Sequence, residues 1–70
     1  MTYVFTIHGE SMIAWLQYSD PSLVRRDEIK TWEFDTAEEA AAFGLGINYA
    51  NQVADCNIYI LDESEYNALI

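Results

Sequence analysis

The sequence predicts a small α+β domain. In it, a single-layer sheet of mixed and antiparallel strands packs on one long helix, in the order β-β-β-α-β-α with a short C-terminal helix. The long helix is predicted from Thr36 and Glu39, which have the T-x-x-E spacing of a capping box. Apolar residues then recur on one helix face, at Ala40, Phe43, Ile47, Ala50 and Ala54. Alternating runs of β-branched and aromatic residues predict the strands.

The first two strands are expected to form a hairpin. Residues 2–7 are rich in β-branched and aromatic types, and residues 12–18 alternate in the same way. Between them, Gly9 lies in a segment that permits a turn. Both faces of the second run carry bulky side chains, as expected for a central strand or for one whose outer face meets a partner.

A connecting segment precedes the third strand. Residues 19–22 break the strand pattern, and we interpret them as a loop, with a single helical turn after Asp20 and Pro21 as the alternative. Residues 28–34 are predicted to form the strand. The side chains expected to face the core from it are Lys30, Trp32 and Phe34.

The predicted long helix ends near residues 53–55, and residues 57–61 resume a strand. Asp62 and Glu65 then repeat the capping pattern, which predicts a helix over residues 63–69. Because a helix connects the third and fourth strands, these strands should run parallel, with the fourth beside the first.

The chain is strongly acidic, with twelve Asp and Glu residues, three Lys and Arg residues and a formal net charge of −9. All three basic residues lie within residues 1–35, and residues 36–70 hold six acidic residues and no basic one. Such a surface repels nucleic acid and anionic lipid, because it lacks cations that could replace the counterions of phosphate groups. A partner attracted by charge is therefore basic. Seventy residues provide one core, so residues 1–70 are expected to form a single domain.

The single cysteine, Cys56, excludes an internal disulfide and a C-x-x-C motif, in agreement with a reducing compartment. No apolar run approaches about 18 residues, and residues 1–4 lack the basic region of a signal peptide. We therefore expect a cytoplasmic protein without a membrane-spanning segment.

Candidate catalytic groups are few. His8 stands beside Gly9 and Glu10, but no Ser or Cys has a spacing that would let it act with this imidazole. Cys56 follows Asp55 at the predicted helix end, where the dipole disfavours a thiolate, so we interpret it as a buried or half-buried inert thiol. The carboxylates at the two helix starts lack the spacing of a calcium-binding EF-hand loop. No catalytic, cofactor-binding or metal-binding residue is predicted, and we expect no enzymatic activity.

A strand end and a Glu-rich helix start are joined in the run Trp32-Glu33-Phe34-Asp35-Thr36-Ala37-Glu38-Glu39-Ala40-Ala41-Ala42-Phe43. This run resembles small phage-encoded proteins, among them anti-CRISPR and other anti-defence inhibitors. The resemblance implies a small, acidic, non-enzymatic protein that occupies a nucleic-acid-binding surface or a protein interface. It covers about twelve residues and assigns a role to none of them.

The sequence thus predicts a protein-binding module, an inhibitor that mimics nucleic acid toward a basic partner. The alternative is a homodimeric domain without catalytic activity, and an acid-site enzyme or metal binder ranks third. Leu45 and Tyr49 lie opposite the sheet-facing stripe of the helix, and either they are exposed or a loop or the C-terminal tail covers them. The predicted partner-binding residues are Asp35, Glu38, Glu39, Leu45, Tyr49, Asp62, Glu63 and Glu65.

Overall fold

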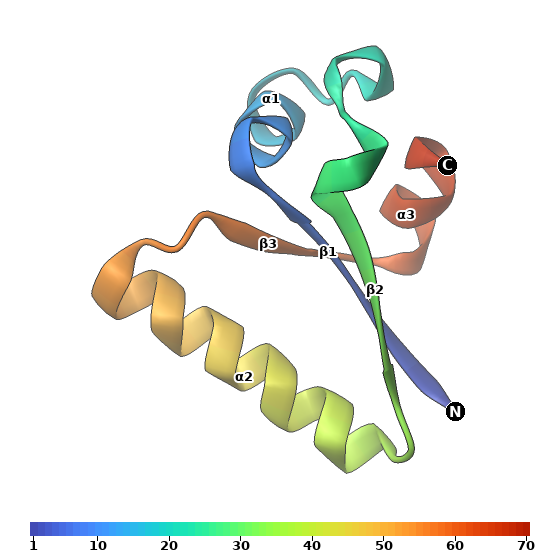
Figure 1. Cartoon of the computed structure of the whole chain (residues 1–70), viewed down its shortest axis with the longest axis vertical. Helices are drawn as coiled ribbons and strands as arrows, with labels where there is room; N and C mark the ends of the chain where they lie inside the picture. The colour runs from blue at the N-terminus through green and yellow to red at the C-terminus, as the bar shows by residue number, and fades with distance from the viewer.

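A computed structural model describes all seventy residues and confirms the α+β class (Figure 1). Three strands, β1 (Thr2–His8), β2 (Ile29–Phe34) and β3 (Ile58–Leu61), form one sheet in the order β2-β1-β3. Both β2 and β3 pair antiparallel with β1, so they run parallel to each other without touching. The predictions that these two strands share a direction, and that the last strand lies beside the first, are confirmed.

The predicted second strand is wrong. Residues 12–18 belong to a helix, α1 (Gly9–Tyr18), and the element order is β-α-β-α-β-α. Both edges of β1 are occupied by β2 and β3, so no edge remains for a hairpin partner. As a helix the segment instead places Met12 and Trp15, three residues apart, in the core.

The segment between α1 and β2 contains two single turns of 3-10 helix, η1 (Pro21–Leu23) and η2 (Arg26–Glu28). The structure therefore has the helical turn after Asp20 that the sequence offered as the alternative to a loop. The Asp20 carboxylate accepts a hydrogen bond from the Ser22 amide at 3.0 Å and caps this turn. The hydrogen bond from the Ser22 hydroxyl, together with that from the Ser22 amide, lowers the pKa of Asp20.

Helices cover both faces of the sheet (Figure 1). The long helix α2 (Ala37–Ala54) lies on one side, and α1 lies on the other side with α3 (Glu63–Leu69). The main core is on the side of α1 and α3 and consists of Ile7, Met12, Trp15, Leu61 and Leu69. None of the helices combines the length and the apolar character that crossing a membrane requires.

The face of β2 that carries Trp32 and Phe34 packs on α2, not on the main core. Each of these rings lies 5.1 Å from the Phe43 ring, centroid to centroid, yet Trp32 remains 39% exposed. The expectation that Lys30, Trp32 and Phe34 face the core is therefore wrong for the main core. Trp32 and Phe34 face the smaller contact with α2, and Lys30 itself is exposed. In the helix stripe predicted to face the sheet, Ala40 and Ile47 are buried, whereas the last member, Ala54, is exposed.

The two predicted helix starts are confirmed. The Thr36 hydroxyl accepts a hydrogen bond from the Glu39 amide at 3.2 Å, while the Glu39 carboxylate accepts one from the Thr36 hydroxyl instead of from its amide. The second start has the complete capping box: Asp62 accepts from the Glu65 amide at 2.8 Å, and the Glu65 carboxylate accepts from the Asp62 amide at 3.1 Å.

Candidate partner-binding surface

The side of α2 that points away from the sheet forms a continuous exposed surface, which we call the outer face of α2. Its members recur at the three- and four-residue spacing of one helix face and are all exposed. They are Glu38, Ala41, Ala42, Leu45, Tyr49, Gln52 and Val53.

Three large apolar side chains stand along this face, four residues apart. Leu45 is 70% exposed, Tyr49 66% and Val53 65%. The alternative that the C-terminal tail covers Leu45 and Tyr49 is wrong, because the tail forms α3 on the other side of the sheet (Figure 1). Sequence reasoning missed Val53, although it continues the four-residue spacing of Leu45 and Tyr49. Exposed apolar residues aligned on one helix are typical of an interaction site.

Uncompensated carboxylates border the outer face at the start of α2. Asp35, Glu38 and Glu39 are all exposed, and α2 contains no Lys or Arg that could pair with them. The one ion pair of the chain joins Arg25 to Asp27 at 2.8 Å, in the segment before β2. The predicted carboxylate group at this helix start is therefore free to face a cationic partner.

The second predicted carboxylate group lies at the start of α3. Asp62 and Glu63 are exposed, and hydrogen bonds from the Glu65 amide and the Ser64 hydroxyl hold the pKa of Asp62 below its usual value. Because α2 and α3 lie on opposite sides of the sheet, the structure does not bring the two carboxylate groups together (Figure 1).

Of the predicted site residues, Glu65 is the one most engaged inside the fold. It is half-buried, and its carboxylate accepts a hydrogen bond from the Trp15 indole at 3.1 Å, besides capping α3. The Tyr59 hydroxyl also donates to it at 3.4 Å. Burial, together with the negative charge of Glu65, raises the pKa of Tyr59. These contacts leave Glu65 less free for a partner than Asp62 or Glu63.

Gly46 flanks the outer face and has open space around it, since no atom outside its chain neighbours and the adjacent backbone of α2 lies within 4 Å of the position that a Cβ would occupy. We expect Gly46→Ala to stabilise the free chain by about 0.5–1 kcal/mol, because alanine has the higher helix propensity. A urea denaturation series followed by circular dichroism measures this change. A midpoint that falls instead would show that another part of the chain packs on this position.

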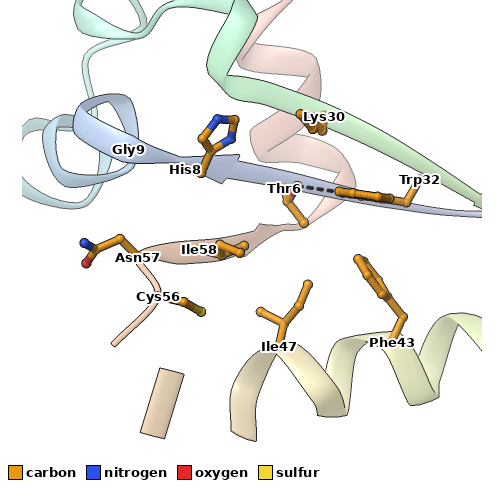
Figure 2. Close-up of a pocket in the computed structure, with 10 residues that line it drawn as sticks. All are labelled: Thr6, His8, Gly9, Lys30, Trp32, Phe43, Ile47, Cys56, Asn57 and Ile58. Atoms are coloured by element: carbon orange, nitrogen blue, oxygen red, sulfur yellow. Dashed lines mark hydrogen bonds between the residues drawn. The ribbon is translucent and has the colours of Figure 1, made fainter. Parts of the chain in front are cut away.

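A cavity of about 560 Å³ lies between the sheet and α2 (Figure 2). Residues from β1 and the start of α1, from β2, from α2, and from the segment before β3 and the start of β3 border it, and they include His8 and Cys56. Cys56 is exposed, which corrects the expectation of a buried or half-buried thiol, and its thiol donates a hydrogen bond to Asn51 at 2.9 Å. Sequence reasoning missed this cavity.

No three His, Cys, Asp or Glu side chains are grouped in a way that could hold a metal ion. No family model, curated protein or solved structure matches this chain.

Proposed function

We propose that this chain is a non-enzymatic protein-binding module that inhibits a basic, nucleic-acid-binding protein by occupying its binding surface. The contact surface is the outer face of α2 together with the carboxylates at the start of that helix. The observation that carries the proposal is the exposure of Leu45, Tyr49 and Val53 on a helix whose charged side chains are all acidic.

The two parts of this surface have different roles in binding. Apolar and aromatic side chains that become fully desolvated contribute most of the affinity of protein interfaces, so Leu45 and Tyr49 act as anchors. Charged groups at the rim mainly set the association rate and the choice of partner. Asp35 and Glu38 take that role, and the net charge of −9 adds long-range attraction toward a basic protein. Asp62 and Glu63 contribute only to this long-range attraction, because they lie on the other side of the sheet.

A basic protein fits this surface better than a second copy of the chain. Two copies would each bring a charge of −9, and α2 offers no cation with which the carboxylates of the other copy could pair. Like charges disfavour such a pair, whereas a basic partner gains from them. A homodimer through Leu45 and Tyr49 is the competing hypothesis, favoured by the same apolar exposure.

The test is capture of a partner from cell lysate on the immobilised chain, followed by kinetic measurements with the identified protein. We expect a basic nucleic-acid-binding protein that duplex DNA or RNA displaces, and that dissociates about tenfold faster from a Leu45→Ala, Tyr49→Ala variant. An Asp35→Asn, Glu38→Gln variant should slow association, most strongly at low salt, because the Debye length is then long. The chain itself should show no binding to DNA or RNA.

Matched variants on the other side of the sheet provide the controls. Leu16 and Tyr18 of α1 are 55% and 62% exposed, so Leu16→Ala with Tyr18→Ala removes similar apolar area from a different face. Glu10→Gln with Glu63→Gln removes two charges away from α2. If the control variants lose the partner as strongly as the α2 variants, the contact surface is elsewhere. If light scattering shows a dimer that Tyr49→Glu dissociates, the second copy is the occupant of the outer face.

A further inference from the structure

The cavity between the sheet and α2 is large for a chain of this size. Its volume of about 560 Å³ falls within the range of about 300–1,000 Å³ that is usual for small-molecule sites. It lies on the face of the sheet opposite the main core, and α2 forms its other wall (Figure 2). The outer face of α2 points away from it.

One side of the cavity is apolar. The Trp32 and Phe43 rings meet at 5.1 Å between centroids with their planes inclined by 47°, and Ile47 and Ile58 extend the wall from α2 and β3 (Figure 2). The Trp32 indole is fixed in place, because its N–H donates a hydrogen bond to the Thr6 hydroxyl at 2.9 Å. Such a wall suits the face of an aromatic ring.

The Thr6 hydroxyl also leaves a hydrogen-bond donor at the cavity. Thr6 is only 2% exposed, and its oxygen accepts from the Trp32 indole. The hydroxyl is satisfied as an acceptor and donates in none of the hydrogen bonds of the structure, so its hydrogen is available to a ligand. A ligand with an acceptor oxygen would satisfy it.

The charge at the cavity is the reverse of that of the whole chain. Lys30 of β2 is paired with Thr6 of β1 and takes part in no ion pair, and its ammonium group lies 5.8 Å from the centre of the Trp32 ring. His8 stands on the same side of β1. No Asp or Glu is among the ten residues that border the cavity, although the chain has twelve of them. The Glu28 carboxylate lies next to the lining, where it packs on Gly9 and accepts a hydrogen bond from Ser11, so it offsets a positive charge near His8 but not one near Lys30. A concave site that has the Lys30 ammonium group at its border and no carboxylate in its lining favours an anion.

We propose that this cavity binds a small aromatic carboxylate, with its ring on Trp32 and Phe43 and its carboxylate between Lys30 and the Thr6 hydroxyl. The lining places an apolar aromatic wall, a hydroxyl that can donate and an ammonium group that takes part in no ion pair around one space. This site is independent of the partner-binding surface and does not require the proposed inhibitor function.

The experiment is a titration of the isotope-labelled chain with naphthoate and, separately, with the neutral naphthamide, followed in the N–H correlation spectrum. The chain has two indole N–H signals, one from Trp32 at the cavity and one from Trp15 on the opposite face of the sheet, bonded to Glu65. We expect naphthoate to shift the Trp32 signal in a saturable way and to leave that of Trp15 in place. Naphthamide should bind about tenfold more weakly, because it lacks the charge.

Variants test the named contacts. Lys30→Gln should weaken naphthoate binding about tenfold, while Lys30→Arg restores it and Arg26→Gln, a cation outside the lining, has no effect. Thr6→Val keeps the shape but removes both the hydroxyl donor and the acceptor of the Trp32 indole. The loss of the indole bond affects both probes, so the loss of the donor should appear as a larger weakening for naphthoate than for naphthamide. Equal affinity for the two probes, equal shifts of both indole signals, or unchanged binding in Lys30→Gln would each overturn the proposal.

Discussion

Replacement of Ile7 by alanine is expected to leave the chain largely unfolded at room temperature. Ile7 is 0% exposed and lies at the centre of the main core, in contact with the cluster that contains Trp15 and Leu61. Removing three carbons from such a position typically costs about 2–5 kcal/mol. A core of this size rarely supplies more than about 3–5 kcal/mol of net stability, so the loss is comparable to the whole. Circular dichroism and a urea denaturation series measure the outcome.

Two variants on α2 serve as comparisons. Phe43→Ala should cost less than Ile7→Ala, because Phe43 is half-buried and borders a cavity that already leaves part of its surface without contacts. Tyr49→Ala should change stability by less than about 0.5 kcal/mol, since its side chain is 66% exposed. If Phe43→Ala unfolds the chain while Ile7→Ala remains folded, the dominant core lies between the sheet and α2.

The parts of the fold that were predicted correctly depend on signals contained in short segments. Thr36 and Asp62 start helices because each side chain accepts a hydrogen bond from an amide three residues later, which needs no other part of the chain. The alternation in residues 2–7 likewise identified β1, since this strand has one face on the core and one on α2.

The segment of residues 12–18 was assigned wrongly because its apolar residues satisfy both periods. Met12 and Trp15 have helical spacing, whereas Met12, Leu16 and Tyr18 have the even spacing of a strand. Tertiary structure decides between them, because β2 and β3 occupy both edges of β1 and the main core needs a cover. No signal within the segment carries that information.

The candidate sites, too, were predictable from the sequence only where short-range spacing defines them. Leu45 and Tyr49 could be placed on one helix face from their spacing, but their exposure depends on where the C-terminal helix packs. The cavity was out of reach of sequence reasoning, because its lining comes from four separate segments. Thr6, Lys30 and Ile58 meet only through the pairing of three strands.

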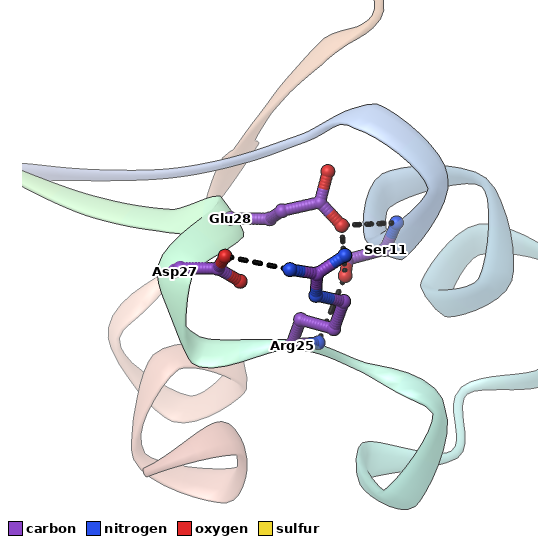
Figure 3. Close-up of polar contacts among 4 residues, drawn as sticks. All are labelled: Ser11, Arg25, Asp27 and Glu28. Atoms are coloured by element: carbon purple, nitrogen blue, oxygen red, sulfur yellow. Dashed lines mark hydrogen bonds and ion pairs between the residues drawn. The ribbon is translucent and has the colours of Figure 1, made fainter.

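The reversal from β1 into α1 depends on Gly9, and we expect Gly9→Ala to be strongly destabilising. Gly9 has a φ of +66°, a left-handed conformation that costs an alanine about 1–2 kcal/mol. A Cβ at this position would also overlap the Glu28 carboxylate. That carboxylate accepts hydrogen bonds from the Ser11 hydroxyl at 2.7 Å and from its amide at 3.3 Å, and it fastens the start of α1 to the segment before β2 (Figure 3). The substitution therefore has two effects: it strains the backbone at Gly9, and it displaces the Glu28 carboxylate that is bonded to Ser11.

Denaturant midpoints of single and double variants separate these two contributions. Gly44→Ala is the matched control, since its Cβ would meet only Ile60 at an ordinary 3.6 Å, and it should leave stability unchanged or raise it. If overlap with the carboxylate matters, Gly9→Ala should cost less in a Glu28→Ala background than in the natural chain. Equal costs in the two backgrounds would assign the effect to backbone strain alone, and no cost in either would contradict the left-handed turn at Gly9.

The hydrogen bonds between Ser11 and Glu28 also predict how the stability of the fold depends on pH. The hydrogen bond from the Ser11 hydroxyl holds the pKa of Glu28 below its ordinary value of 4.5. As the pH falls, the unfolded chain therefore takes up the proton at this position before the folded chain does. The stabilising contribution of Glu28 is complete above pH 4.5 and is lost as the pH falls through the lowered folded value. Glu28→Gln, which cannot titrate, should therefore lose less stability than the natural chain between neutral and acidic pH. An equal loss in both would show that the Ser11 contact does not couple proton uptake to folding.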